Sequence, residues 1–225
     1  MSLKLAIFDL DGTLIDSRQI IQSAMVRAFE KHGLTPPAYD QTRRVIGLDL
    51  GIACQTLAPD LQGDQLAQLV ESYRGAFVEL RAEGAGFEPL YDGARETVER
   101  LANENWILAI ATGKARRGIN AFFDQHKMSD LFDTSWCADD GPGKPHPFMV
   151  DQCMKTLGAA PDQTLIIGDA IHDITMGRNA GIHTMGVTWG FGEADELQAV
   201  GAHEVHHDFT SLNTGLDEFA GAPTR

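Results

Sequence analysis

Cysteine is scarce in this sequence, and its few residues are not arranged to form disulfide bonds or to bind a metal. Cys54, Cys137 and Cys153 are odd in number and lie far apart, without a CxxC pair. Disulfide frameworks and thiolate zinc sites both need cysteines at characteristic spacings. The pattern therefore argues against both and predicts three reduced, buried thiols, which suit the cytoplasm.

Positive charge is also scarce, which limits the partners that the chain can have. The sequence holds 18 lysines and arginines against 32 aspartates and glutamates, a formal net charge of −14. Binding to nucleic acids and to membrane surfaces depends on basic side chains. No apolar run approaches the roughly 20 residues that span a bilayer. We therefore expect a cytoplasmic protein that binds neither nucleic acid nor membrane, as a monomer or a homodimer.

Short apolar runs, by contrast, are frequent and alternate with helical patterns. These runs cover 3–9, 106–112, 164–169 and 183–189, with weaker candidates at 131–139 and 204–209. Nearly continuous hydrophobic runs are typical of parallel strands that are covered on both faces. Helical patterns occupy 92–103 and 146–158. The alternation predicts an α/β fold with a Rossmann-like, doubly wound parallel sheet.

A helical segment interrupts this alternation after the first strand. One apolar stripe follows Ser17, a candidate N-cap, and a second occupies 66–80, with short helices expected around a turn at Gly47. Such stripes are typical of helices that pack on one another. We therefore predict a small all-α domain over 16–86, inserted into a core formed by 1–15 and 87–225.

Carboxylates gather where two of the predicted strands end. Asp9 and Asp11 follow the first strand in the segment DLDGT, and Asp169 and Asp173 lie in the segment GDAIHD. Ligands of an open α/β sheet bind at the carboxyl ends of its strands, so these side chains are expected to converge. Carboxylate oxygens suit Mg²⁺, which leaves other positions to water and substrate phosphate. The alternative is that these residues only cap helices and turns.

Groups that suit a phosphate come from two further segments. Thr112 and Gly113 follow one strand, and Lys144 lies in the loop GPGKPHP. A hydroxyl, a main-chain N–H and an amine would hold phosphate oxygens. With the charge neutralised, one aspartate can attack a phosphoryl group while the other moves protons. These groups predict a phosphoryl-transfer site.

Four motifs occur in a fixed order along the chain: DLDGT, AT before GK, GKPHP and GDAIHD. Together they resemble the motifs of the haloacid dehalogenase superfamily, in the branch that carries a helical cap after the first motif. Phosphoglycolate phosphatase and its near relatives look most similar. The resemblance covers nearly the whole chain and implies a Mg²⁺-dependent phosphatase that hydrolyses a small phosphorylated metabolite through a phospho-aspartate.

The resemblance also implies a role for each matching residue. Asp9 matches the nucleophile and Asp11 the general acid and base, and Lys144 matches the lysine that neutralises both nucleophile and phosphate. The metal ligands correspond to Asp9, Asp11 through its main-chain carbonyl, Asp169, and Asp173 through a bound water. The remaining phosphate contacts fall on Thr112 and Gly113.

The turn of the inserted domain is implied to take part in substrate binding. In capped relatives this loop reaches the active site and contacts the leaving group, so Gly47 and Leu48 are expected beside the substrate. Arg43 and Arg44 precede the turn. The sequence leaves open whether they contact the substrate or form a solvated helix face.

Two other functions fit the same groups. A sugar-phosphate mutase of the same superfamily would return the phosphoryl group to a sugar, and a catalytically silent protein would only bind phosphate. The segment from His203 to His207 also suggests a metal site. A strand would place His206 and His207 on opposite faces, which argues against a shared ion.

Overall fold

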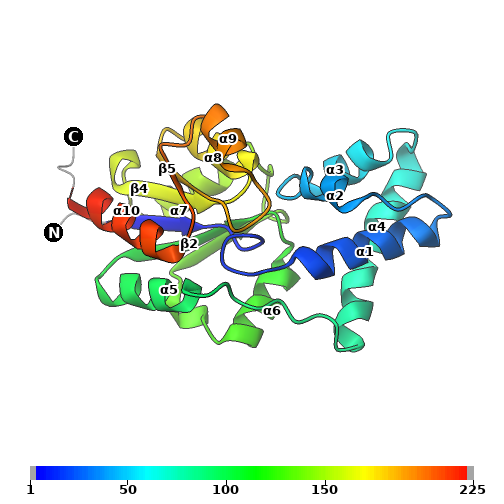
Figure 1. The fold of residues 1–225 in the computed structure, drawn as a ribbon, viewed down its shortest axis with the longest axis horizontal. Coiled ribbons are helices and arrows are strands. Elements are labelled where there is room, and N and C mark those ends of the chain that lie inside the picture. Colours follow the sequence, from blue (N-terminus) through cyan, green and yellow to red (C-terminus); the bar gives the residue numbers. More distant parts are fainter. Residues whose placement is uncertain (1–3, 222–225) are drawn as a thin grey trace.

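A six-stranded sheet forms the centre of the protein, which we describe from a computed structural model covering residues 4–221. Neighbouring strands are all parallel, in the order β3-β2-β1-β4-β5-β6 (Figure 1). The strands are β1 (Leu5–Phe8), β2 (Ile107–Thr112), β3 (Thr134–Cys137), β4 (Thr164–Gly168), β5 (His183–Val187) and β6 (Glu204–His206). The predicted parallel sheet is therefore confirmed; Leu3, where the first predicted strand begins, lies outside the described residues.

Helices connect the strands and cover the sheet. They are α1 (Arg18–Lys31), α2 (Tyr39–Arg43), α3 (Leu50–Leu57), α4 (Gly63–Ala82), α5 (Ala94–Asn103), α6 (Arg116–His126), α7 (Phe148–Leu157), α8 (Ile171–Asn179), α9 (Ala194–Ala199) and α10 (Phe209–Gly221). Within residues 4–221, none of them is both long and apolar enough to cross a membrane.

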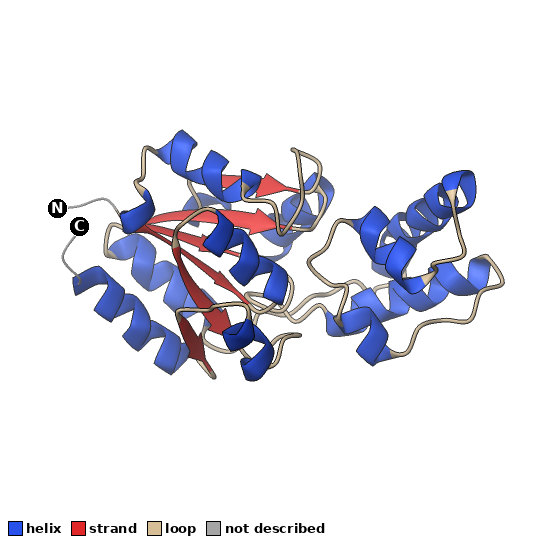
Figure 2. Ribbon diagram, turned by 90° about the horizontal axis from the view of Figure 1, so that it is seen from above, coloured by secondary structure: helices blue, strands red, loops and turns tan. Residues whose placement is uncertain are grey.

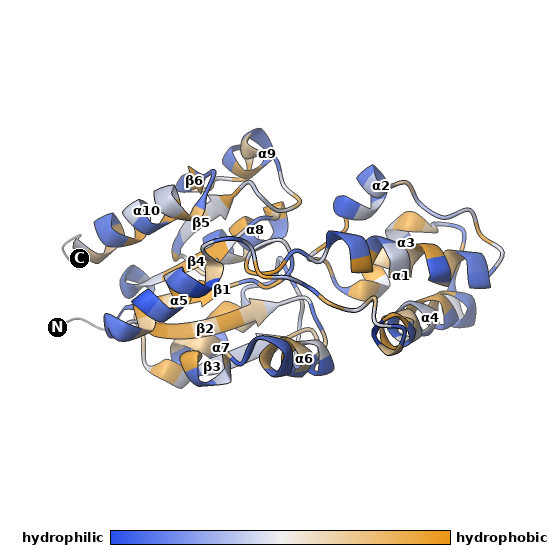
Figure 3. Cartoon of the chain, turned by 60° about the horizontal axis from the view of Figure 1, so that its bottom comes forward, coloured by the Kyte–Doolittle hydropathy of each residue, from blue (hydrophilic) through white to orange (hydrophobic). Residues whose placement is uncertain are grey.

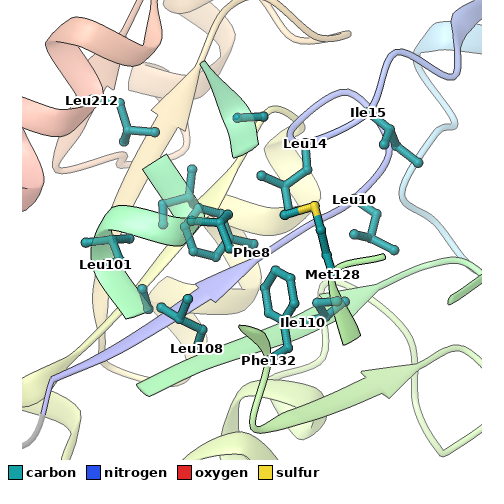
Figure 4. Packing of buried hydrophobic residues seen from close by; sticks show 14 of the residues in the cluster. Phe8, Leu10, Leu14, Ile15, Leu101, Leu108, Ile110, Met128, Phe132 and Leu212 are labelled. Atoms are coloured by element: carbon teal, nitrogen blue, oxygen red, sulfur yellow. The ribbon is translucent and has the colours of Figure 1, made fainter. Parts of the chain in front are cut away.

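Both faces of the sheet are buried because successive strand residues point to opposite sides. Phe8 and Ile110 pack on one face against α5, α6 and α10, whereas Ile7 and Ile166 pack on the other against α7 and α8. The central strands β1, β2 and β4 are accordingly hydrophobic along most of their length, while the helices carry both kinds of residue (Figure 3). Figure 4 shows the first face, where the rings of Phe8 and Phe132 meet edge-on at 6.4 Å.

The helices α1 to α4, which we call the helical insert, stand apart from the sheet and pack on one another (Figure 2). Met25 and Phe29 of α1 meet Leu69 of α4 in a buried cluster. The predicted helix after Ser17 is confirmed, and Ser17 occupies the N-cap position, but its hydroxyl caps no main-chain N–H. Its ψ of 8° lies outside the extended region that a capping side chain requires.

Two connections join the helical insert to the sheet, and they lie side by side. Asp16 N donates to Pro89 O at 2.8 Å, and Tyr91 N donates to Leu14 O at 3.0 Å. The insert therefore begins and ends at the same place in the core. We propose that the segment between these connections is the cap domain expected over 16–86.

Candidate active site

The order of the strands places the ends of β1 and β4 next to each other. From β1 the chain continues to β2 and β3 on one side, and from β4 to β5 and β6 on the other. Such a reversal leaves a crevice at the carboxyl ends of the two central strands, where ligands bind. Asp9 follows β1, Asp169 follows β4, and Asp173 lies in the first turn of α8. Carboxylates that are distant in the sequence thus share one crevice.

Asp9, Asp169 and Asp173 form a buried cluster in which one carboxylate oxygen from each lies within 4.8 Å of the others. Burial raises the pKa of Asp9 to about 7, with Asp173 adding to the effect and Lys144 opposing it. Burial and the neighbouring carboxylates likewise raise the pKa of Asp169 well above its usual value. Carboxylates so close together repel one another when ionised. Three hard oxygen ligands in this arrangement fit a divalent cation such as Mg²⁺.

Hydrogen bonds from three further residues orient two of these carboxylates. Thr13 Oγ1 donates to Asp169 Oδ1 at 2.9 Å, and the main-chain N of Phe191 donates to Asp169 Oδ2 at 2.7 Å. Ala170 N donates to Asp173 Oδ2 at 3.0 Å. Such bonds hold ligand oxygens in place and strengthen their preference for the charged form.

Lys144 completes the charge balance of the cluster. Its side chain is fully buried, and Nζ lies 2.9 Å from Asp9 Oδ1 and 2.5 Å from Asp173 Oδ1. Burial alone would lower the pKa of Lys144, but the two carboxylates raise it above its usual value. The amine is therefore charged and offsets part of the negative charge beside Asp9.

The side chain of Asp11 is not part of this three-carboxylate cluster and contacts Lys114. Lys114 Nζ lies 2.8 Å from Asp11 Oδ1 and 2.6 Å from Glu88 Oε1. The geometry agrees with a role for the Asp11 carboxylate separate from metal binding. Sequence reasoning missed Lys114 and Glu88 as site residues. The signal for Lys114 was its position directly after Gly113, at the end of the strand that pairs with β1.

A cavity of about 160 Å³ lies between these carboxylates and the helical insert. Asp9, Asp11 and Gly113 line it from the core, and Gly47 and Leu48 line it from the insert. The other insert residues on this wall are largely apolar and include Ile21, Met25, Val45, Tyr73 and Phe77. The turn at Gly47, where φ is +90°, therefore borders the same cavity as Asp9 and Asp11.

Two predicted phosphate contacts occupy different positions relative to this cavity. Gly113 borders it, and a Cβ atom on this residue would lie 3.4 Å from Gly47 O. Thr112 is fully buried at the end of β2, where its Oγ1 accepts a hydrogen bond from Lys114 N at 3.3 Å. The main chain after β2 is thus the part that reaches the cavity.

The two arginines before the turn have different surroundings. Arg43 Nη1 donates to the main-chain oxygen of Phe191 at 3.0 Å and lies 3.5 Å from Glu196 Oε2. Arg44 is exposed, and within residues 4–221 neither arginine lines the cavity. Arg43 therefore joins the helical insert to the core.

The C-terminal histidines lie elsewhere. His206 is buried at the end of β6, and His207 follows the strand and is exposed. Glu204 Oε1 pairs with His183 Nε2 at 2.8 Å. In the described part of the chain, the cluster at Asp9 is the group of side chains arranged to hold a metal.

Comparison with known proteins shows the family to which the chain belongs. The model of the haloacid dehalogenase-like hydrolase family matches residues 6–187. A probable phosphatase, IndB, of Dickeya dadantii is 33% identical over 213 residues, covering 92% of this chain and 91% of that protein. A phosphoglycolate phosphatase of Pseudomonas putida is 28% identical, with 94% and 79% covered. The crystal structure of a hydrolase from Pseudomonas syringae superposes with a TM-score of 0.85 at 30% identity, covering 96% and 98%. The chain belongs to the haloacid dehalogenase-like hydrolase family.

Proposed function

We propose that this protein is a Mg²⁺-dependent phosphatase that hydrolyses a small phosphomonoester through a phospho-Asp9 intermediate. The buried cluster of Asp9, Asp169 and Asp173 beside the charged Lys144 is the observation that carries this proposal. Membership of the family and the names of two relatives, a probable phosphatase and a phosphoglycolate phosphatase, support phosphate ester chemistry.

In this proposal Asp9, Asp169, Asp173 and the main-chain carbonyl of Asp11 hold the cation, which neutralises phosphate charge when bound. Asp9 attacks phosphorus while Lys144 offsets the charge between nucleophile and phosphate. The ester oxygen departs with a proton from Asp11. Asp11 then takes a proton from water, which attacks the phosphorus, releases inorganic phosphate and restores Asp9.

The residues around the cavity support a small substrate. We propose that the phosphate oxygens are held by Thr112, Gly113 and Lys144. The leaving group would contact Gly47 and Leu48 of the helical insert. A cavity of about 160 Å³ leaves room for a compact ester such as phosphoglycolate. The helical insert, lying over the cavity, would also exclude bulk water and leave space for the one water molecule that attacks the phosphorus.

The cellular location, the oligomeric state and the partners of the protein are also proposals. Its three cysteines are free and buried, which is compatible with a reducing cytoplasm. We propose that it acts there on a small phosphorylated metabolite, as a monomer or homodimer, without nucleic acid or membrane partners.

The decisive experiment measures inorganic phosphate released from phosphoglycolate, sugar phosphates, nucleoside monophosphates, pyrophosphate and an aryl phosphate. Wild type is compared with Asp9→Asn and with the exposed control Asp60→Asn, each with Mg²⁺ or with a chelator. Release that needs Mg²⁺ and vanishes only in Asp9→Asn is the expected result. Unchanged release by Asp9→Asn would refute the mechanism. Phosphate exchange between sugar positions would favour the mutase, and binding without turnover would favour a silent phosphate-binding protein.

A further inference from the structure

A chain of alternating charges links the helical insert to Asp11. Arg81 Nη2 of α4 lies 3.1 Å from Glu88 Oε2, Glu88 Oε1 lies 2.6 Å from Lys114 Nζ, and Lys114 Nζ lies 2.8 Å from Asp11 Oδ1. The side chains of Glu88 and Lys114 are only 4% and 7% exposed. Buried ion pairs contribute little net stability compared with apolar side chains of similar size. Stability alone therefore does not account for these two charges.

Glu88 is fixed to the core through its main chain. Gln125 Nε2 of α6 donates to Glu88 O at 2.7 Å, and His126 Nε2 lies 2.9 Å from the same oxygen. The carboxylate of Glu88 extends from this anchored backbone to Arg81 on one side and Lys114 on the other. Glu88 thus joins an insert residue to a residue beside the proposed acid and base.

Lys114 holds one particular oxygen of Asp11. Its amine contacts Asp11 Oδ1, a buried atom, and lies 5.9 Å from the ring centroid of Phe77 on α4. Asp11 itself lines the cavity. No residue between 4 and 221 hydrogen-bonds to Asp11 Oδ2, so this oxygen is the one available to exchange a proton with a substrate.

We propose that Lys114 and Glu88 are positioning residues, which hold Asp11 ready for proton transfer while the helical insert is seated on the core. The proposal rests on the function of Asp11 proposed above. Lys114 acts through Asp11, and Glu88 acts through Lys114. Without this support the carboxylate rotates, and the leaving oxygen departs without a well-placed proton.

The leaving group provides a selective test. An alkyl oxygen is strongly basic and needs a proton as it departs, whereas a nitrophenyl oxygen leaves readily without one. Loss of Asp11 positioning should therefore lower kcat/KM, which reports the steps up to departure of the leaving group, far more for alkyl phosphates than for 4-nitrophenyl phosphate. The later attack of water also uses Asp11, but it is common to both esters and does not enter kcat/KM. General destabilisation of the fold, or loss of a phosphate contact, would slow both substrates alike.

The experiment compares Lys114→Met, Lys114→Arg and Glu88→Gln with the exposed control Lys155→Met on α7. We expect Lys114→Met to lower kcat/KM by about 10–100-fold for phosphoglycolate and by less than about threefold for 4-nitrophenyl phosphate. Glu88→Gln should show the same selectivity to a smaller extent, and Lys114→Arg should recover part of the loss. Lys155→Met should match wild type.

Equal losses of kcat/KM for both esters, or an increase in KM with kcat preserved, would overturn the proposal and assign Lys114 to substrate binding or to structure. Circular dichroism and thermal unfolding check that each variant folds. If Lys114→Met does not fold, the double variant Lys114→Met/Glu88→Gln is measured instead. In the double variant Glu88 carries no charge, so no buried carboxylate is left without its lysine partner. If wild type shows no Mg²⁺-dependent release of phosphate, the proposed function is refuted instead. Failure of the proposed function and failure of the positioning proposal are therefore distinguishable.

Discussion

Phe191 connects the helical insert to the carboxylate cluster through its two main-chain groups. Its oxygen accepts a hydrogen bond from Arg43 Nη1 at 3.0 Å, and its N–H donates to Asp169 Oδ2 at 2.7 Å. One residue of the core thus meets the insert on one side and supports a proposed metal ligand on the other. The position of the insert and the geometry of the cluster are therefore physically linked.

Removal of this link should weaken catalysis without abolishing it. We expect Arg43→Ala to lower kcat/KM by about 3–10-fold, because the hydrogen bond from the charged Arg43 to Phe191 O and the partly exposed ion pair with Glu196 are lost. Arg44→Ala is the matched control, since Arg44 is exposed and does not line the cavity. Steady-state kinetics of the two variants distinguish them. Equal activity of Arg43→Ala and wild type would show that the contact is not needed.

Gly12 should not tolerate a side chain. Its φ is +81°, and a Cβ atom there would lie 2.2 Å from Asp169 Oδ2. We expect Gly12→Ala to lower the free energy of unfolding by about 2 kcal/mol or more and to reduce stabilisation by Mg²⁺. Gly75→Ala, inside α4 with open space around it, should be neutral or slightly stabilising. Chemical denaturation with and without Mg²⁺ measures both effects, and similar stabilities would contradict the strain argument.

Stability without metal should depend on pH through the cluster. The pKa of Asp9 in the folded protein, about 7, lies above its usual 3.8, so the folded state binds this proton more tightly than the unfolded chain. The associated stability is complete below that usual value and is lost as pH rises through about 7. If Mg²⁺ binds the cluster as proposed, it binds the deprotonated form, so it should raise Tm more at pH 8 than at pH 5. Thermal unfolding with chelator or Mg²⁺ tests this, and equal shifts at both pH values would contradict it.

Asp9→Asn serves as the internal control for this pH dependence. Without the ionisable group, the Tm of the metal-free protein should fall less between pH 5 and pH 8 than that of wild type. Asp169 also has a raised pKa, so part of the dependence should remain. An unchanged pH profile would show that Asp9 does not carry the effect.

The helical insert should unfold locally when its own core is weakened. Leu69 is fully buried among α1, α3 and α4, so Leu69→Ala should cost about 2–4 kcal/mol. Hydrogen exchange should then quicken in α1 to α4 and stay slow in the sheet. Leu101→Ala, equally buried but in the sheet cluster, should quicken exchange in the core. Faster exchange throughout in both variants would contradict the division at 16–86.

The sheet could be predicted from the sequence because both of its faces are covered. Strands such as β2 and β4 are then continuous apolar runs, and the polar residues that follow them mark the edge where ligands bind. The apolar stripe of α1 was equally clear in the sequence, and its residues are the buried ones of this helix: Ile20, Ile21, Ala24, Met25, Ala28 and Phe29. By contrast, α9 has six residues and buries only Leu197, so it offers no periodic pattern.

The contacts across the two parts of the molecule could not be predicted in this way. Arg81 meets Glu88, and Arg43 meets Phe191, only because the helical insert sits over the ends of the strands. Charge pairs between distant segments leave no periodic signal in a sequence. The motifs placed Asp9, Asp169 and Lys144 at one edge, and their catalytic roles stay predictions until they are tested.

The neighbouring entry and exit points of the helical insert have an evolutionary consequence. Because the hydrogen bonds from Asp16 to Pro89 and from Tyr91 to Leu14 hold these points together, a segment of different length or sequence can replace the one between them without shifting the sheet. Recombination at this junction would exchange the part proposed to contact the leaving group and preserve the residues proposed to break the bond. Proteins with this architecture can therefore acquire new substrates while the residues proposed to catalyse the reaction stay the same.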